Sequence, residues 1–274
     1  MDKINKVELF KSFIHICLND DIKNLETFSF WDIAGSKYDG TAKSEKDSKF
    51  DGDHTLIAKA IYWILWKDKG IPEFGEYNFD LVKNSYSGDT INTYNTLFGS
   101  SEEINQRVLS ILELTEKEKK DLERFYKLYQ TIGNFYILPK NTINKESLNT
   151  YWSKRWNDFF DIFLQVLDSG LNNIESVDVS FGCLLKENDF FFSSINYSID
   201  KFCKLFYLYD EEENYNYLTD FTLYGSGLHF SHTMLCNKNK DAYKSFALSY
   251  IDTASKLIEK RSKVIVRELS KCIL

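Results

Sequence analysis

Residues 240–271 read KDAYKSFALSYIDTASKLIEKRSKVIVRELSK. Apolar side chains return every three or four residues through this stretch, which places them on one face of a helix. They are Tyr243, Phe246, Ala247, Ile251, Ala254, Leu257, Ile258, Ile265 and Leu269. The sequence therefore predicts a long amphipathic C-terminal helix at about 240–271, which is the clearest element of the chain.

The rest of the chain predicts further helices and some short strands. Helical periodicity or composition is found over 7–18, 55–67, 102–112, 145–167 and 189–209. Thr115 and Glu118 have the spacing of a capping box, which predicts the start of another helix. Apolar patterns predict strands over 28–31, 74–82, 134–138 and 174–181, whereas Ser87–Thr90 predicts a turn. The expected fold class is α+β, predominantly α-helical with a few short strands.

Composition favours a folded chain. Of its 274 residues, 43% are hydrophobic and 16% aromatic, which is enough to bury a large core and excludes a wholly disordered chain. Length alone permits one large domain or two small ones. Because no linker rich in Pro, Ser or Gly divides the chain, we expect a single globular domain over 1–274. Its most polar stretch predicts a long loop at about 35–53.

The sequence carries no obvious targeting signal. No apolar run is long enough for a secretory signal or a membrane span. The five cysteines are widely spaced and form no CxxC pair, so we expect them to pack as small hydrophobes in a reducing cytosol. A reactive thiol and disulfides are the alternatives. A cytoplasmic protein that does not associate with membranes is therefore expected.

Charge is distributed unevenly. The formal net charge of −7 makes the chain a poor general binder of nucleic acid. The second half of the C-terminal helix is nevertheless basic, with Lys256, Lys260, Arg261, Lys263, Arg267 and Lys271 against Glu259 and Glu268. We expect a solvated face there, with contact to a phosphate backbone as the less favoured alternative. Asp210–Glu213 predicts an acidic, solvated turn.

Asp53 and His54 are the candidate catalytic residues. Together with Asp51 they bring two carboxylates and an imidazole within four positions, a combination that can bind a divalent metal or activate water. The alternative is an N-capping Asp53 beside an exposed His54. Spacing dictates no further ligands, so no metal site is assigned.

A second group of polar residues flanks the expected element ends, where backbone groups are free to join a ligand site. These candidate binding residues are Asp89, Asn134, Asn144, Arg155 and Asp158. Gly133 permits a positive φ just past a helix, and Asn134 can close the turn with its own side chain. Arg155 and Asp158 can form an intrahelical ion pair or, turned towards Asn134, an anion site. We predict that positions 53, 89, 134 and 155 meet in one polar hollow.

Several short motifs also carry a family resemblance. They are Phe28–Asp32, Asp53–Leu56 followed by Leu65–Lys67, Ser87–Ile91, Ile132–Asn134 with Leu138–Pro139, and Arg155–Asp161. In these motifs the chain resembles an uncharacterised bacterial domain family of hypothetical proteins with an Asp-Thr-Ile and an Ile-Gly-Asn…Leu-Pro motif. The usual proline after Leu65–Lys67 is displaced to Pro72, and the polar loop before Asp53 is enlarged. The resemblance implies no known reaction and supplies candidate positions only.

Asp53-His54, Gly133–Leu138 and Asn144 also resemble parts of HNH-type nuclease domains from modification-dependent restriction systems. That resemblance implies His54 as general base, Asp53 or Asn144 as metal ligand or orienting residue, and Mg²⁺ or Mn²⁺ as cofactor. The chain departs from the pattern in the long separation of His54 from Gly133 and in the missing proline after His54.

The leading functional hypothesis is a cytoplasmic bacterial binding or regulatory protein with a polar ligand pocket, from a mobile-element or phage-defence setting. It expects no cofactor, and its partner is a protein or a small ligand. The first alternative is the HNH-like nuclease that uses His54. The second is a structural interaction protein without a small-molecule site, which would expose an aromatic patch instead.

Overall fold

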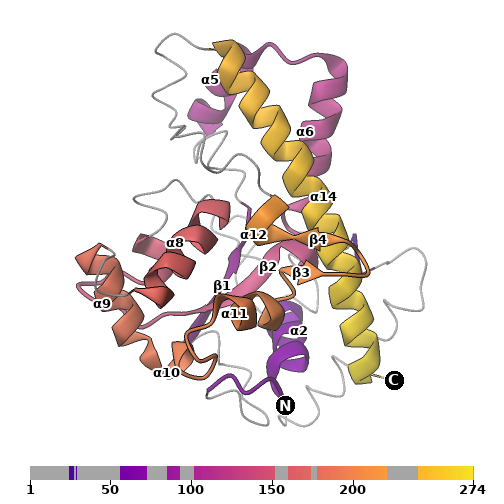
Figure 1. Cartoon of the computed structure of the whole chain (residues 1–274). Coiled ribbons are helices and arrows are strands. Elements are labelled where there is room, and N and C mark those ends of the chain that lie inside the picture. The colour runs from indigo at the N-terminus through magenta and orange to yellow at the C-terminus, as the bar shows by residue number, and fades with distance from the viewer. Residues whose placement is uncertain are drawn as a thin grey trace.

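The computed structural model describes residues 25–27, 29, 56–72, 85–92, 102–151, 160–173, 178–220 and 240–273. Helices predominate and the strands are short (Figure 1), so the predicted α+β class is confirmed. The longer helices are α2 (Leu56–Trp66), α5 (Glu102–Leu112), α6 (Glu116–Leu128), α8 (Phe160–Asn172), α9 (Val179–Glu187) and α14 (Lys240–Ile273). The shorter ones are η4 (Ile132–Asn134), α10 (Asp189–Phe192), α11 (Ile199–Leu205) and α12 (Tyr217–Asp220). The elements expected over 7–18 and 74–82 and the loop expected at about 35–53 lie outside the described residues.

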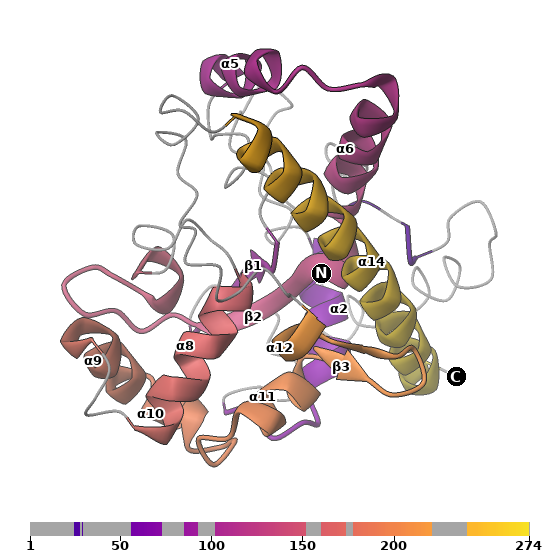
Figure 2. The same cartoon turned by 45° about the horizontal axis from the view of Figure 1, so that its top comes forward.

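Helix α14 confirms the predicted C-terminal helix and organises the fold. It runs diagonally through the molecule, and its N-terminal half rises with α5 and α6 above the body (Figures 1 and 2). It packs against α6, η4, α2, α5 and the hairpin strand β3 (Tyr209–Asp210). Its buried side chains belong to one apolar cluster that also takes in α2, β2 (Phe135–Pro139), α8, α9 and α11. The predicted stripe therefore faces this core.

Helix α6 begins where the capping box was expected. The Thr115 amide donates to Oε2 of Glu118 at 2.7 Å, and the Glu118 amide donates back to Oγ1 of Thr115 at 3.3 Å. Two free N–H groups of the first turn are satisfied in this way. Arg124, further along α6, pairs with Glu259 and ties α6 to α14.

The segment predicted as a turn at Ser87–Thr90 is instead part of strand β1 (Tyr86–Thr90). It pairs antiparallel with β2 (Phe135–Pro139), with Gly88 opposite Ile137. The turn prediction was wrong because Ser, Gly and Asp favour turns locally, whereas a fully buried partner strand offers them ladder hydrogen bonds. The extended segment expected over 134–138 is confirmed in β2.

Two other predicted elements differ from the structure. Val179 and Phe181, predicted in a strand, begin helix α9, which is capped by the Asp178 carboxylate. Val179 is 81% exposed, so the alternation did not mark one buried face. The helix expected from about residue 145 starts later, because residues 143–146 form a turn with Asn144 and Lys145 at φ 51° and 69°. Residues 148–151 are helical, and α8 runs past the expected end at Leu167.

The region expected to be helical over 189–209 contains α10 and α11, separated by Asn196 and Tyr197 at positive φ. It ends in a small antiparallel hairpin of β3 (Tyr209–Asp210) and β4 (Tyr215–Asn216). Helix α12 follows β4 directly, and both α11 and α12 pack on α8. This compact unit positions the site described below.

Candidate functional site

The structure brings together two of the sequence motifs that were singled out. Because β1 pairs with β2, Asp89 lies in register with Tyr136, and the Ile91 amide donates to the Asn134 carbonyl at 2.8 Å. Asn144 is exposed in the 143–146 turn. The candidates Asp53, His54, Arg155 and Asp158 lie outside the described residues. A common hollow for positions 53, 89, 134 and 155, and the nuclease hypothesis built on His54, therefore stay predictions.

The side chain of Asn134 is fully buried and bonded within the chain. Its Nδ2 donates to the carbonyls of Asn92 (2.9 Å) and Tyr129 (2.8 Å), and its Oδ1 accepts from the Asn92 amide (3.0 Å). The Tyr250 hydroxyl donates in turn to Oδ1 of Asn92 at 3.1 Å. These bonds close the turn before β2 and join it to α14, which is a structural task.

Arg261 does not lie on the solvated face where the sequence analysis placed it. It is fully buried, and it donates from Nε to the Phe206 carbonyl (2.9 Å) and from Nη1 to the Gly133 carbonyl (2.7 Å). Within the described part of the chain it has no ion pair, and burial lowers the pKa of its guanidinium. Helical periodicity alone does not reveal that one cation of a basic run turns inward.

Gly133 packs against α14 at that same point. A Cβ on this residue would overlap Oγ of Ser262 and the Ile258 carbonyl oxygen. The glycine is thus required by close approach rather than by the positive φ that was expected. Among the described glycines, Gly70 is the one with a positive φ, of 75°.

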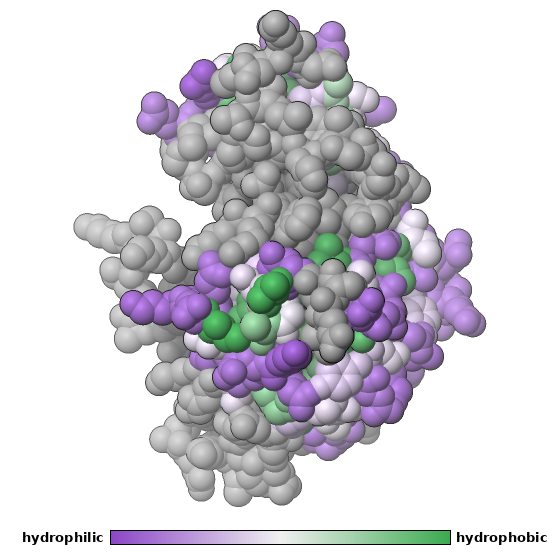
Figure 3. All heavy atoms as spheres, turned by 60° about the vertical axis from the view of Figure 1, so that its left-hand side comes forward, coloured by the Kyte–Doolittle hydropathy of each residue, from purple (hydrophilic) through white to green (hydrophobic). Residues whose placement is uncertain are grey.

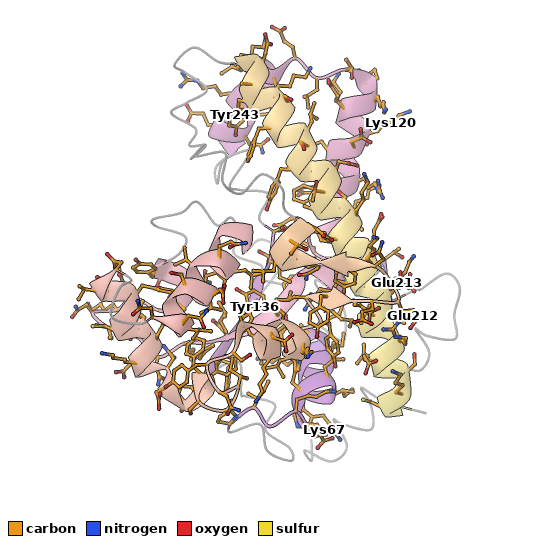
Figure 4. The ribbon with its side chains drawn as sticks, viewed as in Figure 1. Lys67, Lys120, Tyr136, Glu212, Glu213 and Tyr243 are labelled. Carbon is orange, nitrogen blue, oxygen red and sulfur yellow. The ribbon has the colours of Figure 1, made fainter. Side chains whose placement is uncertain are left out.

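Three further basic residues of α14 contact the β3–β4 hairpin and its acidic turn, whereas Lys256 and Lys271 pair within α14 and stay exposed. Arg267 Nη2 lies 2.5 Å from Oδ2 of Asp210, and its Nη1 lies 2.8 Å from Oε2 of Glu212. The other contacts are Lys263 Nζ with Glu213 Oε2 at 3.7 Å and Lys260 Nζ with the Asn214 carbonyl at 2.7 Å. Figure 4 shows Glu212 and Glu213 beside α14. The two segments predicted as solvated surfaces are therefore in contact at Arg267 and Lys263. Much of each surface is exposed as expected, including Lys256, Lys263, Lys271, Glu211 and Glu212.

A hollow of about 610 Å³ lies between α11, the β3–β4 hairpin and α12. This volume is in the range of small-molecule sites. The residues that define its chemistry are Asp200, Cys203, Asp210, Glu211, Tyr215 and Asp220. Tyr209 also lines it. The walls thus combine carboxylates from three separate elements with two tyrosine rings.

The four carboxylates differ in how far the protein already neutralises them. Asp200 accepts a 2.8 Å hydrogen bond from Lys204, and Asp210 pairs with Arg267. Asp220 accepts from the Asn216 amide at 2.8 Å, a bond to an uncharged group. Glu211 and Asp220 have no ion pair with any residue in the described ranges. The hollow therefore keeps a surplus of negative charge.

The other walls offer packing and hydrogen bonds rather than a nucleophile. Burial, with smaller contributions from Asp200 and Asp168, raises the pKa of the Cys203 thiol to about 12. The thiol thus stays protonated at neutral pH and acts as an apolar surface. Tyr215 donates its hydroxyl to the Tyr207 carbonyl at 2.8 Å, and burial raises its pKa as well.

The ammonium group of Lys204 contacts two residues that line the hollow. Its Nζ lies 2.8 Å from Oδ2 of Asp200 and 5.8 Å from the ring centroid of Tyr209. The hydrogen bond to Asp200 raises the pKa of the lysine. A carboxylate next to an aromatic face is a combination that binds organic cations.

Comparisons with family models, curated proteins and solved structures gave no match. In the described segments, no helix is both long and apolar enough to span a membrane, and no cluster of three or more His, Cys, Asp or Glu side chains has the arrangement of a metal site. The resemblances noted in the sequence, and the cofactor expectations tied to them, stay predictions.

The exposed apolar surface bears on the interaction-protein alternative. Figure 3 shows apolar residues in small groups among hydrophilic ones on the face that carries α8 and α9. Among the described residues, the exposed large hydrophobic side chains are Tyr126 on α6 and Val179 on α9. They lie on different helices and form no common patch.

Sequence reasoning did not select the residues of the hollow. The acidic run from Asp210 to Glu213 was the one available signal, and it was interpreted as a solvated turn. Asp200 and Asp220 lie ten residues on either side of Asp210, a spacing that belongs to no known motif. Only the folding of α11, the hairpin and α12 around α8 brings these carboxylates to one hollow.

Proposed function

We propose that this chain is a binding protein that holds a small organic polycation, of the di- or polyamine class, in the hollow between α11, the hairpin and α12. The observation that carries the proposal is the surplus of carboxylates around a 610 Å³ hollow that also has tyrosine walls. The proposal also keeps the expectation that the chain is a cytoplasmic bacterial regulatory protein from a mobile-element or phage-defence setting.

The distribution of charge supports a ligand with several separated positive groups. Asp200, Asp210 and Asp220 come from α11, β3 and α12, so the negative charges surround the hollow instead of converging on one atom. Ammonium groups spaced along an aliphatic chain can meet several of these carboxylates at once. The methylene groups between them can pack on Tyr209 and Tyr215.

The chemistry of the walls supports binding rather than turnover. Cys203 is held as a neutral thiol, and the Tyr215 hydroxyl is engaged with the Tyr207 carbonyl. Neither side chain is activated as a nucleophile or base. The carboxylates remain as acceptors for charged donors, and hydrogen bonds of that type are about twice as strong as neutral ones.

The experiment is calorimetric titration of the full chain with spermidine at low ionic strength, with butylamine as the monovalent comparison. We expect saturable binding of spermidine, weaker binding of butylamine, and loss of affinity as salt is added. Glu211→Gln combined with Asp220→Asn should weaken spermidine binding by about tenfold or more, about 1.4 kcal/mol. These are the carboxylates without an ion pair in the described structure.

The matched control is Glu123→Gln, which removes a carboxylate that is exposed on α6, away from the hollow. It should leave spermidine affinity nearly unchanged. The proposal fails if spermidine does not bind, or if the double variant and the control bind it equally well.

A further inference from the structure

Asp210 belongs to two surfaces at once. Its carboxylate lines the hollow, and its side chain keeps 16% of its surface exposed. The same carboxylate accepts from Arg267 of α14 through Oδ2 and from the Glu213 amide through Oδ1. A cation in the hollow would therefore share this carboxylate with the guanidinium of Arg267.

The hairpin that carries Asp210 depends on its contacts with α14. Its ladder is only two residue pairs long, Tyr209 with Asn216 and Asp210 with Tyr215. A hairpin of that length is marginal without other support. The ion pairs of Arg267 and Lys263 supply that support on one side, while the hollow lies on the other.

We propose that occupancy of the hollow by a polycation and the pairing of the hairpin with α14 oppose each other through Asp210. This inference rests on the proposed function and adds its regulation. A bound ammonium group draws the Asp210 carboxylate away from Arg267, and Arg267 repels the bound ammonium group. The coupling is reciprocal, because each cation changes the affinity of the carboxylate for the other.

Glu212 provides a second way to test the coupling. It pairs with Arg267 at 2.8 Å but does not line the hollow, and its side chain is 76% exposed. Glu212 and Asp210 therefore both interact with the guanidinium of Arg267. Arg267 Nε also lies 3.9 Å from Oε1 of Glu268. Without the Glu212 charge, more of the charge of Arg267 acts on Asp210, and the ligand loses affinity. Without the Arg267 charge, the Asp210 carboxylate can interact with the ligand alone, so the affinity for the ligand rises.

The test compares spermidine affinity in the wild-type chain with that in three variants. Arg267→Gln should bind about fivefold more tightly, and Glu212→Gln should bind more weakly than wild type. Lys256→Gln is the matched control, since it removes one positive charge from the same helix but its partner is Asp252 of α14 instead of the hairpin. It reports the general effect of net charge.

The outcomes separate the two proposals. If wild type does not bind spermidine, the proposed function fails. If wild type binds it, but Arg267→Gln changes affinity no more than Lys256→Gln, the function stands and the coupling is overturned. A drop in affinity for Arg267→Gln also overturns it. Glu212→Gln changes an exposed side chain, so it decides the question even where Arg267→Gln loosens the hairpin: the coupling is overturned if Glu212→Gln weakens binding no more than Glu123→Gln does.

Discussion

Nη1 of Arg261 donates a 2.7 Å hydrogen bond to the carbonyl of Gly133, 128 residues away in sequence, in a part of the core where both residues are fully enclosed. The same guanidinium reaches the Phe206 carbonyl through Nε. One side chain of α14 thus satisfies two backbone carbonyls, one before β2 and one after α11. It joins the β1–β2 pair to the unit that contains the hollow.

Replacing Arg261 by Ala should destabilise the chain by about 3 kcal/mol, because two buried carbonyls lose their donors and a large side chain leaves the core. Urea unfolding followed by circular dichroism measures the change. Lys271→Ala, at an exposed position of the same helix, should change stability by no more than about 0.5 kcal/mol. Equal effects of the two substitutions would contradict the buried role of Arg261.

Gly133→Ala should lower the unfolding free energy by at least about 2 kcal/mol, since the added methyl group would overlap Ser262 Oγ and the Ile258 carbonyl. Adding Ser262→Gly removes only the first of these clashes. The double variant should therefore remain destabilised by the backbone contact. Full recovery of stability in the double variant would show that α14 does not approach Gly133 as closely as described.

Thr115→Ala should cost about 1 kcal/mol of stability by removing the side-chain acceptor at the start of α6. Glu118→Gln should keep the bond from the Thr115 amide, because an amide oxygen can still accept it. Its cost then reports the lost ion pair with Lys244 of α14, at 2.8 Å. The matched control is Ser249→Ala at an exposed position within α14. A Thr115→Ala variant as stable as this control would count against the capping box.

The buried thiol of Cys203 should lower the free energy of unfolding at alkaline pH. Its pKa in the folded chain is raised to about 12 from an ordinary value of 9.0. Below pH 9 both states carry the neutral thiol and this stability is fully present. As pH rises from 9 towards 12, the unfolded chain releases the proton first, so stability falls.

The buried tyrosines act in the same direction, so the variant Cys203→Ala isolates the contribution of the thiol. The difference in unfolding free energy between wild type and variant, measured in urea at pH 8 and pH 10, should shrink at the higher pH. A difference that is constant across this range would contradict the raised pKa.

The sequence predicted those elements that local chemistry decides. The periodicity of α14, the bounds of α5 and the Thr115 capping box all depend on residues within a few positions of one another. Predictions failed where a distant partner decides the outcome. Ser87–Thr90 contains turn-forming residues, yet β2 makes it a strand. The alternation of Val179 and Phe181 is that of a strand, yet the Asp178 cap begins a helix.

The candidate site shows the same limit more strongly. Asn134 was selected for its unusual local motif, and its amide is used within the fold. The carboxylates of the hollow have no shared local motif, because Asp200, Asp210 and Asp220 lie on three elements. Charge runs were visible along the chain, but which acidic run would meet which basic one depended on tertiary packing.

Helix α14 spans 34 residues without a break, so at about 1.5 Å per residue it is a rod of about 50 Å. A close approach to another backbone, at Gly133, lies beyond its midpoint, with Arg267 on the short side and the α5–α6 arm on the long side. The contact at Gly133 thus divides the helix into a short arm and a long arm. A slight tilt at the hairpin end would swing the distant arm through a larger arc.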